Sequence, residues 1–282
     1  MQIIDLSQIM ISAIFGSKRE LDCTIDDLRA MMLFMIRNIN SNFRRHYGTL
    51  VIAADGKAPY WRKEIFPHYK GNRKKLREKS DVDWDAIHEV VTQFKTELKE
   101  NFPYKFIEID HVEADDIIAV LCQTYQDEEI MIVSSDKDYF QLNNENIKQY
   151  DPINDRYIHN HIDESPSLYL AKHVIKGDRG DGIPNILSDD DTFMVEGKRQ
   201  KTIGKNKLDD LVSLYLAEGK IPEHEEKLAR NITLIDLNHI PPEVKQKIVD
   251  VYSSVVPASR NDMRKYFGIL GLTGCSRSIG EF

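Results

Sequence analysis

Acidic residues gather in a few short stretches of this chain where they could bind metal ions. Four of these stretches follow, or closely follow, predicted parallel strands. They are Asp5, Asp55, the group Glu113, Asp115 and Asp116, and the pair Asp136 and Asp138. In open α/β sheets, ligands bind beyond the carboxyl ends of the strands, so we expect these side chains to converge on one cleft.

Each acid taken singly has a structural alternative. Asp136 could cap the helix after its strand, and Glu113 and Asp115 could complement a helix dipole. Capping needs one acid per helix, whereas these sites supply two or three. Many carboxylates facing one another repel unless cations neutralise them, so the pattern favours a metal site over capping alone.

The chemistry of the predicted ligands indicates which metal they bind. Hard oxygen ligands without accompanying Cys or His select Mg²⁺ or Mn²⁺ over Zn²⁺. Magnesium keeps several waters and uses few direct carboxylates, so this many acids fits two ions. Two ions suit in-line displacement at a phosphate, where one lowers the pKa of the attacking water and the other stabilises the leaving oxygen. The sequence therefore predicts two Mg²⁺ ions, with Mn²⁺ able to substitute.

Two further acids, Asp178 and Asp181, lie in the glycine-rich stretch Gly177–Gly182. An EF-hand is excluded, because counting from Asp178 its third and fifth positions are Gly180 and Gly182 instead of Asp or Asn. A tight glycine turn followed by a helix suits a phosphate backbone held through N–H groups. We therefore expect Arg179, Gly180 and Gly182 to contact nucleic acid.

Basic residues are segregated from the acids, although the net charge is −8. Between Lys57 and Lys79 there are nine Lys or Arg residues and only two acids, and a second run at 198–207 has no acid. This fits a polyanion-binding surface around a cation site, while a solvated helix face stays an equal alternative for either run. The predicted nucleic-acid contacts are Arg62, Lys63, Lys70, Arg73, Lys74, Arg77, Lys198, Arg199 and Lys201. Interleaved aromatics are able to stack on unpaired bases, but we expect packing to be their main role. They are Tyr60, Trp61, Phe66 and Tyr69.

Alternating strand and helix patterns must position these residues. Strands are predicted at Ile3–Leu6, Thr49–Ala54, Lys105–Ile109, Ile130–Val133 and Ile147–Tyr150, and helices at Thr24–Arg45, Trp84–Lys99 and Val112–Gln126. From about Ser165 the pattern is nearly all helical. The fold class is thus α/β, with a mostly parallel central sheet flanked by helices. We expect a core at 1–160, with the basic stretch at about 57–81, and a helical region at 161–282.

No apolar run approaches a membrane span, and no secretory leader is expected. The cysteines Cys23, Cys122 and Cys275 are odd in number and match no metal spacing, which indicates reduced thiols in a cytoplasmic protein.

Motifs carrying these residues occur in the order of the flap endonuclease and 5′-nuclease family. They are Ile-Asp-Leu-Ser (4–7), Ala-Asp-Gly (54–56), Tyr-Lys-Gly-Asn-Arg (69–73), Val-Glu-Ala-Asp-Asp (112–116), Ser-Ser-Asp-Lys-Asp (134–138) and Gly-Asp-Arg-Gly-Asp-Gly-Ile-Pro (177–184). The chain resembles this family over essentially its whole length. Within the family it looks most like the stand-alone phage ribonucleases H, which remove RNA primers, and Trp61-Arg62, the stretch Ser80–Trp84 and the ending Ser278–Phe282 add to that likeness.

The resemblance implies a helical arch over the core and a helix–three-turn–helix element, at about 165–215, that grips duplex DNA. It implies that Asp5, Asp55, Glu113 and Asp115 serve the first metal. Asp136, Asp138, Asp178 and Asp181 would serve the second, directly or through waters, with Asp116 close by. Lys70 would touch the scissile phosphate.

The implied activity is 5′-3′ nuclease action on RNA primers in RNA–DNA hybrids and on 5′ DNA ends or flaps. A monomer is expected, in the host cytoplasm if the chain is phage-encoded. Replisome partners considered are a single-stranded-DNA-binding protein and a sliding clamp.

One stretch departs from the family pattern. Gly182 stands where the family usually has Asn, and Pro184-Asn185 runs into Ser188-Asp189-Asp190-Asp191 instead of a Gly-x-Lys-Thr step. This departure argues against a bound monovalent cation in this stretch and against tight duplex binding. It does not change the prediction of the metal site.

Three other classes compete with a nuclease. A non-catalytic junction-binding replication factor of the same fold predicts missing carboxylates, and none is missing. An aspartyl phosphatase needs Asp-x-Asp beside the first strand, where Asp5 is followed by Leu6-Ser7. A compact acidic ribonuclease leaves the basic stretch and the Gly-Asp turn unexplained.

Overall fold

The computed structural model describes residues 1–17, 24–78, 80, 83–160, 162–272 and 278–282, which form two units that alternate along the chain. The first comprises Met1–Lys57, Asp83–His161 and Pro242–Phe282, and the second Ala58–Val82 and Ile162–Pro241. Cys122 is a buried free thiol whose pKa burial raises to about 12. Cys23, Cys275, Lys79 and part of the Ser80–Trp84 motif lie outside the described residues.

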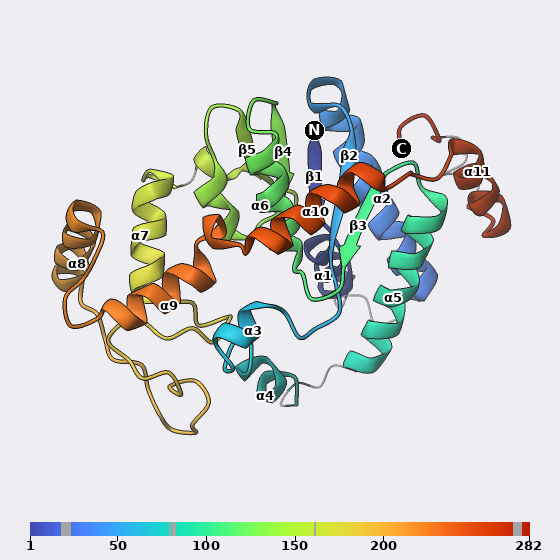
Figure 1. Ribbon diagram of the computed structural model, residues 1–282. Coiled ribbons are helices and arrows are strands. Elements are labelled where there is room, and N and C mark those ends of the chain that lie inside the picture. The colour runs from blue at the N-terminus through green and yellow to red at the C-terminus, as the bar shows by residue number, and fades with distance from the viewer. Residues whose placement is uncertain (18–23, 79, 81–82, 161, 273–277) are drawn as a thin grey trace. The chain divides into compact units, whose positions relative to one another are not determined.

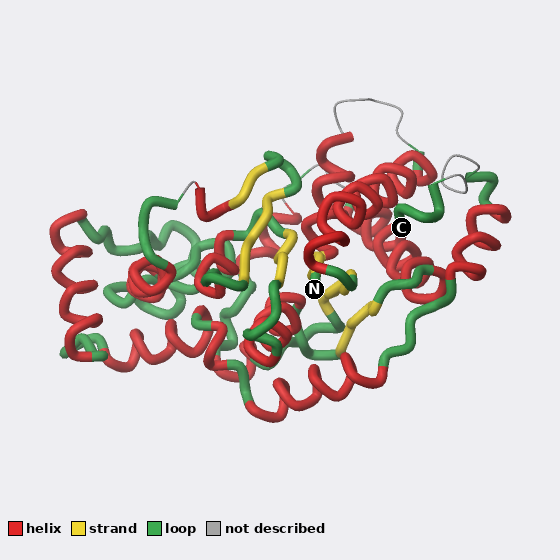
Figure 2. Tube along the Cα trace, turned by 90° about the horizontal axis from the view of Figure 1, so that it is seen from above, coloured by secondary structure: helices red, strands yellow, loops and turns green. Residues whose placement is uncertain are grey.

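A six-stranded sheet forms the centre of the first unit (Figures 1 and 2). Its strands are β1 (Gln2–Asp5), β2 (Leu50–Asp55), β3 (Lys105–Ile109), β4 (Ile130–Val133), β5 (Ile147–Asp151) and β6 (Arg156–Tyr157). The strand order is β3-β2-β1-β4-β5-β6, and all neighbouring pairs are parallel except β5 with β6. The predicted α/β class with a mostly parallel sheet is confirmed, and the short antiparallel β6 is an addition to it.

Helices cover both faces of this sheet (Figure 1). They are α1 (Leu6–Ser17), α2 (Ile25–Tyr47), α5 (Trp84–Asn101), α6 (Ala114–Thr124), α10 (Pro242–Ser254) and α11 (Arg260–Ile269), with short 3-10 helices η1 (Lys137–Leu142) and η2 (Ile158–Asn160). Alternate strand residues such as Ile4, Ile52 and Val133 form one core with α1, α2, α5 and α11. Side chains alternate across a strand, so Ile3, Val51 and Ile132 point to the opposite face, where α6 packs against β1 and β2 and contacts α10.

Local sequence explains how several of these elements begin and end. Thr24 caps α2 by accepting from the Asp27 N–H, and the Asp27 side chain accepts in return from Thr24. β1 is buried along its whole length, as expected of a central strand in a parallel sheet. The C-terminal Phe282 is also buried and packs against Phe102 and Phe267, so the end of the chain is part of this core.

The second unit is helical. It contains α3 (Arg62–Ile65), α4 (Asn72–Glu78), α7 (Pro166–Lys176), α8 (Lys205–Glu218), α9 (Glu225–Ile235) and the 3-10 helix η3 (Leu237–His239). Its core joins Phe66 and Tyr69 from the basic stretch to Val174, Ile186 and Leu234. Phe66 and Tyr69 therefore pack the described part of the basic stretch against α7 and α9. In the described parts of the chain, no helix combines the length and apolar character needed to cross a membrane.

Candidate active site

The strand order places three acidic strand ends side by side in the first unit. From β1 the chain adds β2 and β3 on one side and then returns to place β4 on the other. Asp5 ends β1 and Asp55 ends β2, while Asp136 follows β4 within the turn that starts η1. A change of direction of this kind opens a crevice at the carboxyl edge of a parallel sheet.

Hydrogen bonds tie the carboxylates from different elements together. Asp55 accepts from the Ala114 N–H at the start of α6 and from the Ser7 hydroxyl, both at 2.8 Å. The Tyr139 hydroxyl lies 2.6 Å from Asp115 Oδ1 and 3.2 Å from Asp5 Oδ2. The side chains of Asp5, Asp55 and Asp115 therefore form one cluster, as the strand-end positions suggested.

Asp5 shows the electrostatic character of this cluster. Burial first, and then the nearby charges of Asp55 and Asp136, raise the pKa of Asp5 to about 7. Its carboxylate accepts from the Ser7 N–H at 3.1 Å and from the Ser134 hydroxyl at 3.2 Å, both neutral donors. A buried carboxylate beside two others and supported by neutral groups is an environment that a cation would stabilise.

Two of the other acidic residues in this unit, Asp116 and Asp136, make hydrogen bonds that cap helices. Asp116 is fully buried and accepts from the Glu113 N–H at 3.2 Å, so it caps the start of α6. Asp136 accepts from the Asp138 N–H at 3.0 Å and so begins η1. Glu113 is buried at the N-cap position of α6, and Asp138 is half-buried.

In the second unit, a tight turn after α7 carries Asp178 and Asp181. Ile183 N–H donates to the Asp178 carbonyl at 2.7 Å, and Asp181 N–H donates to Asp178 Oδ1 at 3.0 Å. Gly177 begins the turn with φ +68°, and a Cβ there would lie 2.3 Å from the Ile183 carbonyl oxygen. Both the backbone conformation and the lack of space therefore require glycine at this position.

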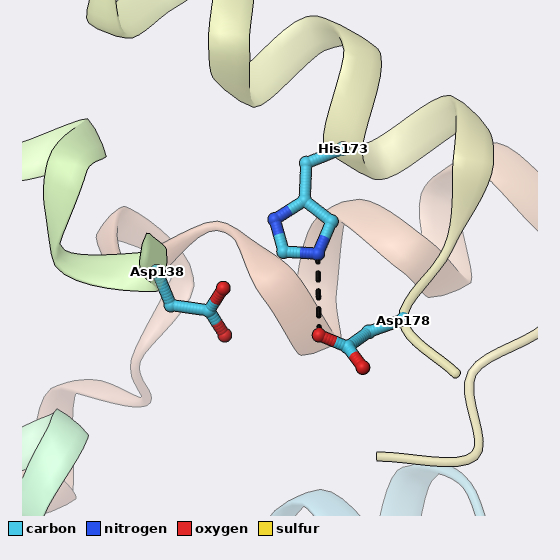
Figure 3. Close-up of side chains that lie close together, drawn as sticks. All are labelled: Asp138, His173 and Asp178. Atoms are coloured by element: carbon cyan, nitrogen blue, oxygen red, sulfur yellow. Dashed lines mark hydrogen bonds and ion pairs between the residues drawn. The ribbon is translucent and has the colours of Figure 1, made fainter. Parts of the chain in front are cut away.

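His173 is a neighbour of this turn that was not among the predicted site residues. It lies on α7, five residues before Asp178, and its Nε2 is 3.3 Å from Asp178 Oδ2 (Figure 3). Burial opposes ionisation of Asp178, but hydrogen bonds from His173 and the backbone of Asp181 outweigh it and lower the pKa of Asp178. The sequence signal that could have identified His173 is its position in the last turn of α7, shortly before Gly177 and Asp178.

Asp181 is held by the basic stretch within the same unit. The Tyr69 hydroxyl donates to it at 3.0 Å, and Arg73 Nη2 lies 2.5 Å from the other carboxylate oxygen. The Lys70 ammonium is 3.7 Å away, and the Lys70 N–H donates to the Asp181 carbonyl at 2.7 Å. The Tyr-Lys-Gly-Asn-Arg motif and the Gly-Asp turn are thus parts of one local structure.

The predicted phosphate contacts in the basic stretch have different environments. Arg62 is buried, stacks on Trp61 and donates through Nε to the Leu234 carbonyl at 3.0 Å, so it is excluded from the surface that a phosphate could reach. Lys63 and Arg77 are exposed, while the side chain of Lys74 lies outside the described residues. As expected, Trp61, Phe66 and Tyr69 are buried and pack.

The Gly-Asp turn and the second basic run also differ from residue to residue. Arg179 and Gly180 are exposed, but Gly182 is buried and its N–H donates to the Arg179 carbonyl. Lys198 forms salt bridges with Asp189 at 3.0 Å and with Asp191 at 2.5 Å. Arg199 and Lys201 are exposed.

The sequence matches two described families along its length. Residues 1–168 match "5′-3′ exonuclease, N-terminal resolvase-like domain", and residues 164–282 match "T4 RNase H, C terminal". Ribonuclease H of Enterobacteria phage T4 is 31% identical, with 99% of this chain and 95% of that protein covered. The flap endonuclease Xni of Shewanella sp. (strain ANA-3) is 32% identical, but the match spans 51% of this chain and 55% of that protein.

This protein belongs to the 5′-3′ exonuclease family and is a metal-dependent nuclease, a hydrolase. Solved structures show the same fold: "Crystal Structure of T5 D15 Protein Co-crystallized with Metal Ions" has a TM-score of 0.62 at 18% identity, covering 89% of this chain and 98% of that one. "Divalent metal ions (zinc) bound to T5 5′-exonuclease" has a TM-score of 0.61 at 17% identity, covering 90% and 98%.

Proposed function

We propose that this nuclease uses magnesium to hydrolyse phosphodiester bonds in the RNA primers of RNA–DNA hybrids and at 5′ DNA ends or flaps during replication. The observation that carries the proposal is the cluster of Asp5, Asp55 and Asp115 at the carboxyl edge of the sheet, in which the Tyr139 hydroxyl bridges Asp5 and Asp115. The name of the phage T4 relative, Ribonuclease H, supports the RNA–DNA substrate. The flap endonuclease relatives support the 5′ flap.

The residues present fit a hard divalent cation. The cluster offers carboxylate oxygens, and burial with neighbouring charge raises the pKa of Asp5 to about 7, so a cation would relieve the repulsion. Asp5, Asp55, Glu113 and Asp115 would hold the first ion, with Mn²⁺ able to replace Mg²⁺. Two bound ions would supply an activated nucleophile and stabilisation of the leaving oxygen. For the second ion, the assignment of Asp136, Asp138, Asp178 and Asp181 stays a prediction from the family resemblance.

Binding of nucleic acid rests on exposed cations of the second unit. Lys63, Arg77, Arg179, Arg199 and Lys201 are exposed and are proposed to contact the phosphate backbone. The helix–three-turn–helix role of residues 165–215 stays part of this proposal, as do a single-stranded-DNA-binding protein and a sliding clamp as partners and the host cytoplasm as location. A solved T5 flap endonuclease of the same fold, TM-score 0.59, is titled a "pseudo-enzyme-product complex with DNA and metal ions", which supports a DNA substrate.

Lys70 has a proposed role at the reacting phosphate. Its ammonium is 3.7 Å from Asp181 and lies 5.1 Å from the centre of the Tyr69 ring, so it is held near one of the predicted ligands. A cation in this place can neutralise developing charge on a phosphate.

A product ladder tests the proposal. A 5′-labelled DNA flap and a nicked RNA–DNA hybrid are digested side by side with Mg²⁺, Mn²⁺ or EDTA. We expect short 5′ products from both substrates with either metal and none with EDTA. Asp115→Asn should lower the rate by at least about two orders of magnitude, as expected for loss of a key electrostatic contact in the transition state. Near-normal turnover by that variant, or an intact RNA strand, would reject the assignment.

A further inference from the structure

Tyr139 is a buried aromatic residue at the centre of the carboxylate cluster. It lies in η1, immediately after Asp138, and is fully buried. Its hydroxyl is 2.6 Å from Asp115 on α6 and 3.2 Å from Asp5 on β1. One side chain following β4 therefore connects acids from two other elements of the same unit.

We propose that Tyr139 is a positioning residue for the first metal site, whose hydroxyl sets the placement of the Asp115 and Asp5 carboxylates before a cation binds. The inference rests on the proposed function, since it assigns a role toward the proposed ion. Tyr139 has no exposed surface and so does not contact substrate. It acts through the two acids that would hold the ion.

The geometry indicates how one hydroxyl serves two acids. A separation of 2.6 Å is typical of a hydroxyl donating to a carboxylate, so the proton points to Asp115. The longer 3.2 Å separation makes Asp5 the secondary acceptor.

A neutral donor is suited to this position. A Lys or Arg would hold the same carboxylates but would also cancel the negative charge that attracts the cation. Tyr139 fixes their direction and leaves that charge in place, as the Ser7 hydroxyl and the Ala114 N–H do for Asp55. Donors in this outer layer orient ligands and tune the metal.

The test compares Tyr139→Phe with a matched control, Tyr104→Phe. Tyr104 is also buried in the first unit, but among the described residues its hydroxyl has no hydrogen-bond partner, so its removal should change nothing at the metal site. Mn²⁺ binding to the nucleic-acid-free protein is measured by electron paramagnetic resonance. We expect Tyr139→Phe to weaken binding about tenfold, the lower end of the range for outer-layer partners of metal ligands, and Tyr104→Phe to match wild type.

A double-mutant cycle separates positioning from packing. If the hydroxyl acts through Asp115, Tyr139→Phe should have little further effect on Mn²⁺ affinity in an Asp115→Asn background, and the two effects should be clearly non-additive. Equal Mn²⁺ affinity of Tyr139→Phe and wild type, or strictly additive effects, would overturn the inference while leaving the nuclease assignment intact. Absence of Mn²⁺ binding and of cleavage in wild type would instead reject the proposed function, and the inference with it.

Discussion

Asp5 should make the metal-free protein less stable at neutral pH than at acid pH. Its carboxyl is buried at the end of β1, where burial and the charges of Asp55 and Asp136 raise its pKa from 3.8 to about 7. Replacing it in Asp5→Asn keeps the size of the side chain and removes the charge. We expect this variant to be inactive but more stable than wild type in EDTA at pH 8.

The sign and size follow from proton linkage. Between about pH 4 and pH 7, the folded state keeps a proton on Asp5 that the unfolded state has lost, so stability falls as the pH rises through this window. A shift of about three units corresponds to roughly 4 kcal/mol once the pH exceeds 7, taken as an upper limit. Because part of this loss has already occurred at pH 5, the stability difference between Asp5→Asn and wild type should grow by roughly 2–3 kcal/mol from pH 5 to pH 8.

Urea unfolding in EDTA at pH 5 and pH 8 measures this difference. Asp127→Asn is the matched control, since Asp127 is exposed and its substitution should give the same difference at both pH values. Saturating Mg²⁺ should stabilise wild type at pH 8 more than Asp5→Asn, because the ion offsets the charge that the variant lacks. An Asp5→Asn stability difference that does not change with pH would refute the reasoning.

Three further predictions concern the basic stretch. Lys70→Ala should lower the single-turnover rate more than it weakens substrate binding, and a pure binding defect with normal saturated turnover would reject the role at the phosphate. Arg62→Gln should lower the free energy of unfolding by roughly 1–3 kcal/mol, because the buried Leu234 carbonyl loses its donor. Lys63→Gln should leave the free energy of unfolding unchanged, and it should reduce the slope of log affinity for DNA against log salt concentration by about one unit. If Arg62→Gln and Lys63→Gln had equal effects on stability and on this slope, the roles assigned from the burial of Arg62 and the exposure of Lys63 would be wrong.

Local sequence patterns were sufficient to predict most of the strands and helices of the first unit. An apolar run followed by an acid or a small polar residue marked β1, β2 and β4, and the structure places these strands within two residues of the expected limits. Parallel strands share one carboxyl edge, so the acids at their ends could be expected near one another. The helix α1 was missed because Leu6–Ser17 is apolar on most sides and follows β1 directly, which leaves no amphipathic period or cap to recognise.

The family resemblance linked the Gly-Asp turn to the same site, but local sequence could not show what surrounds it. His173 reaches Asp178 across the end of α7 and the following turn. Arg73 reaches Asp181 although the two residues are about a hundred positions apart in the chain. Arg62 shows the reverse error. A basic residue within a basic run suggests a phosphate contact, and local sequence could not show otherwise. The hydrogen-bond partner of Arg62, the Leu234 carbonyl, lies far along the chain, and the burial of Arg62 is a property of the folded unit.

The sequence alone thus determined the residue types of the site, the α/β class, the strands that end at Asp5 and Asp55 and the strand that precedes Asp136, because each depends on a short stretch of chain. Tertiary structure alone decided the strand order that places β1 between β2 and β4, the packing of Phe66 and Tyr69 with residues of α7 and α9, and the return of α10 and α11 to the first unit. It also decided that the Tyr139 hydroxyl reaches both Asp115 and Asp5. These features depend on contacts between distant segments, and the free energy of burial that selects them has no local signature in the sequence.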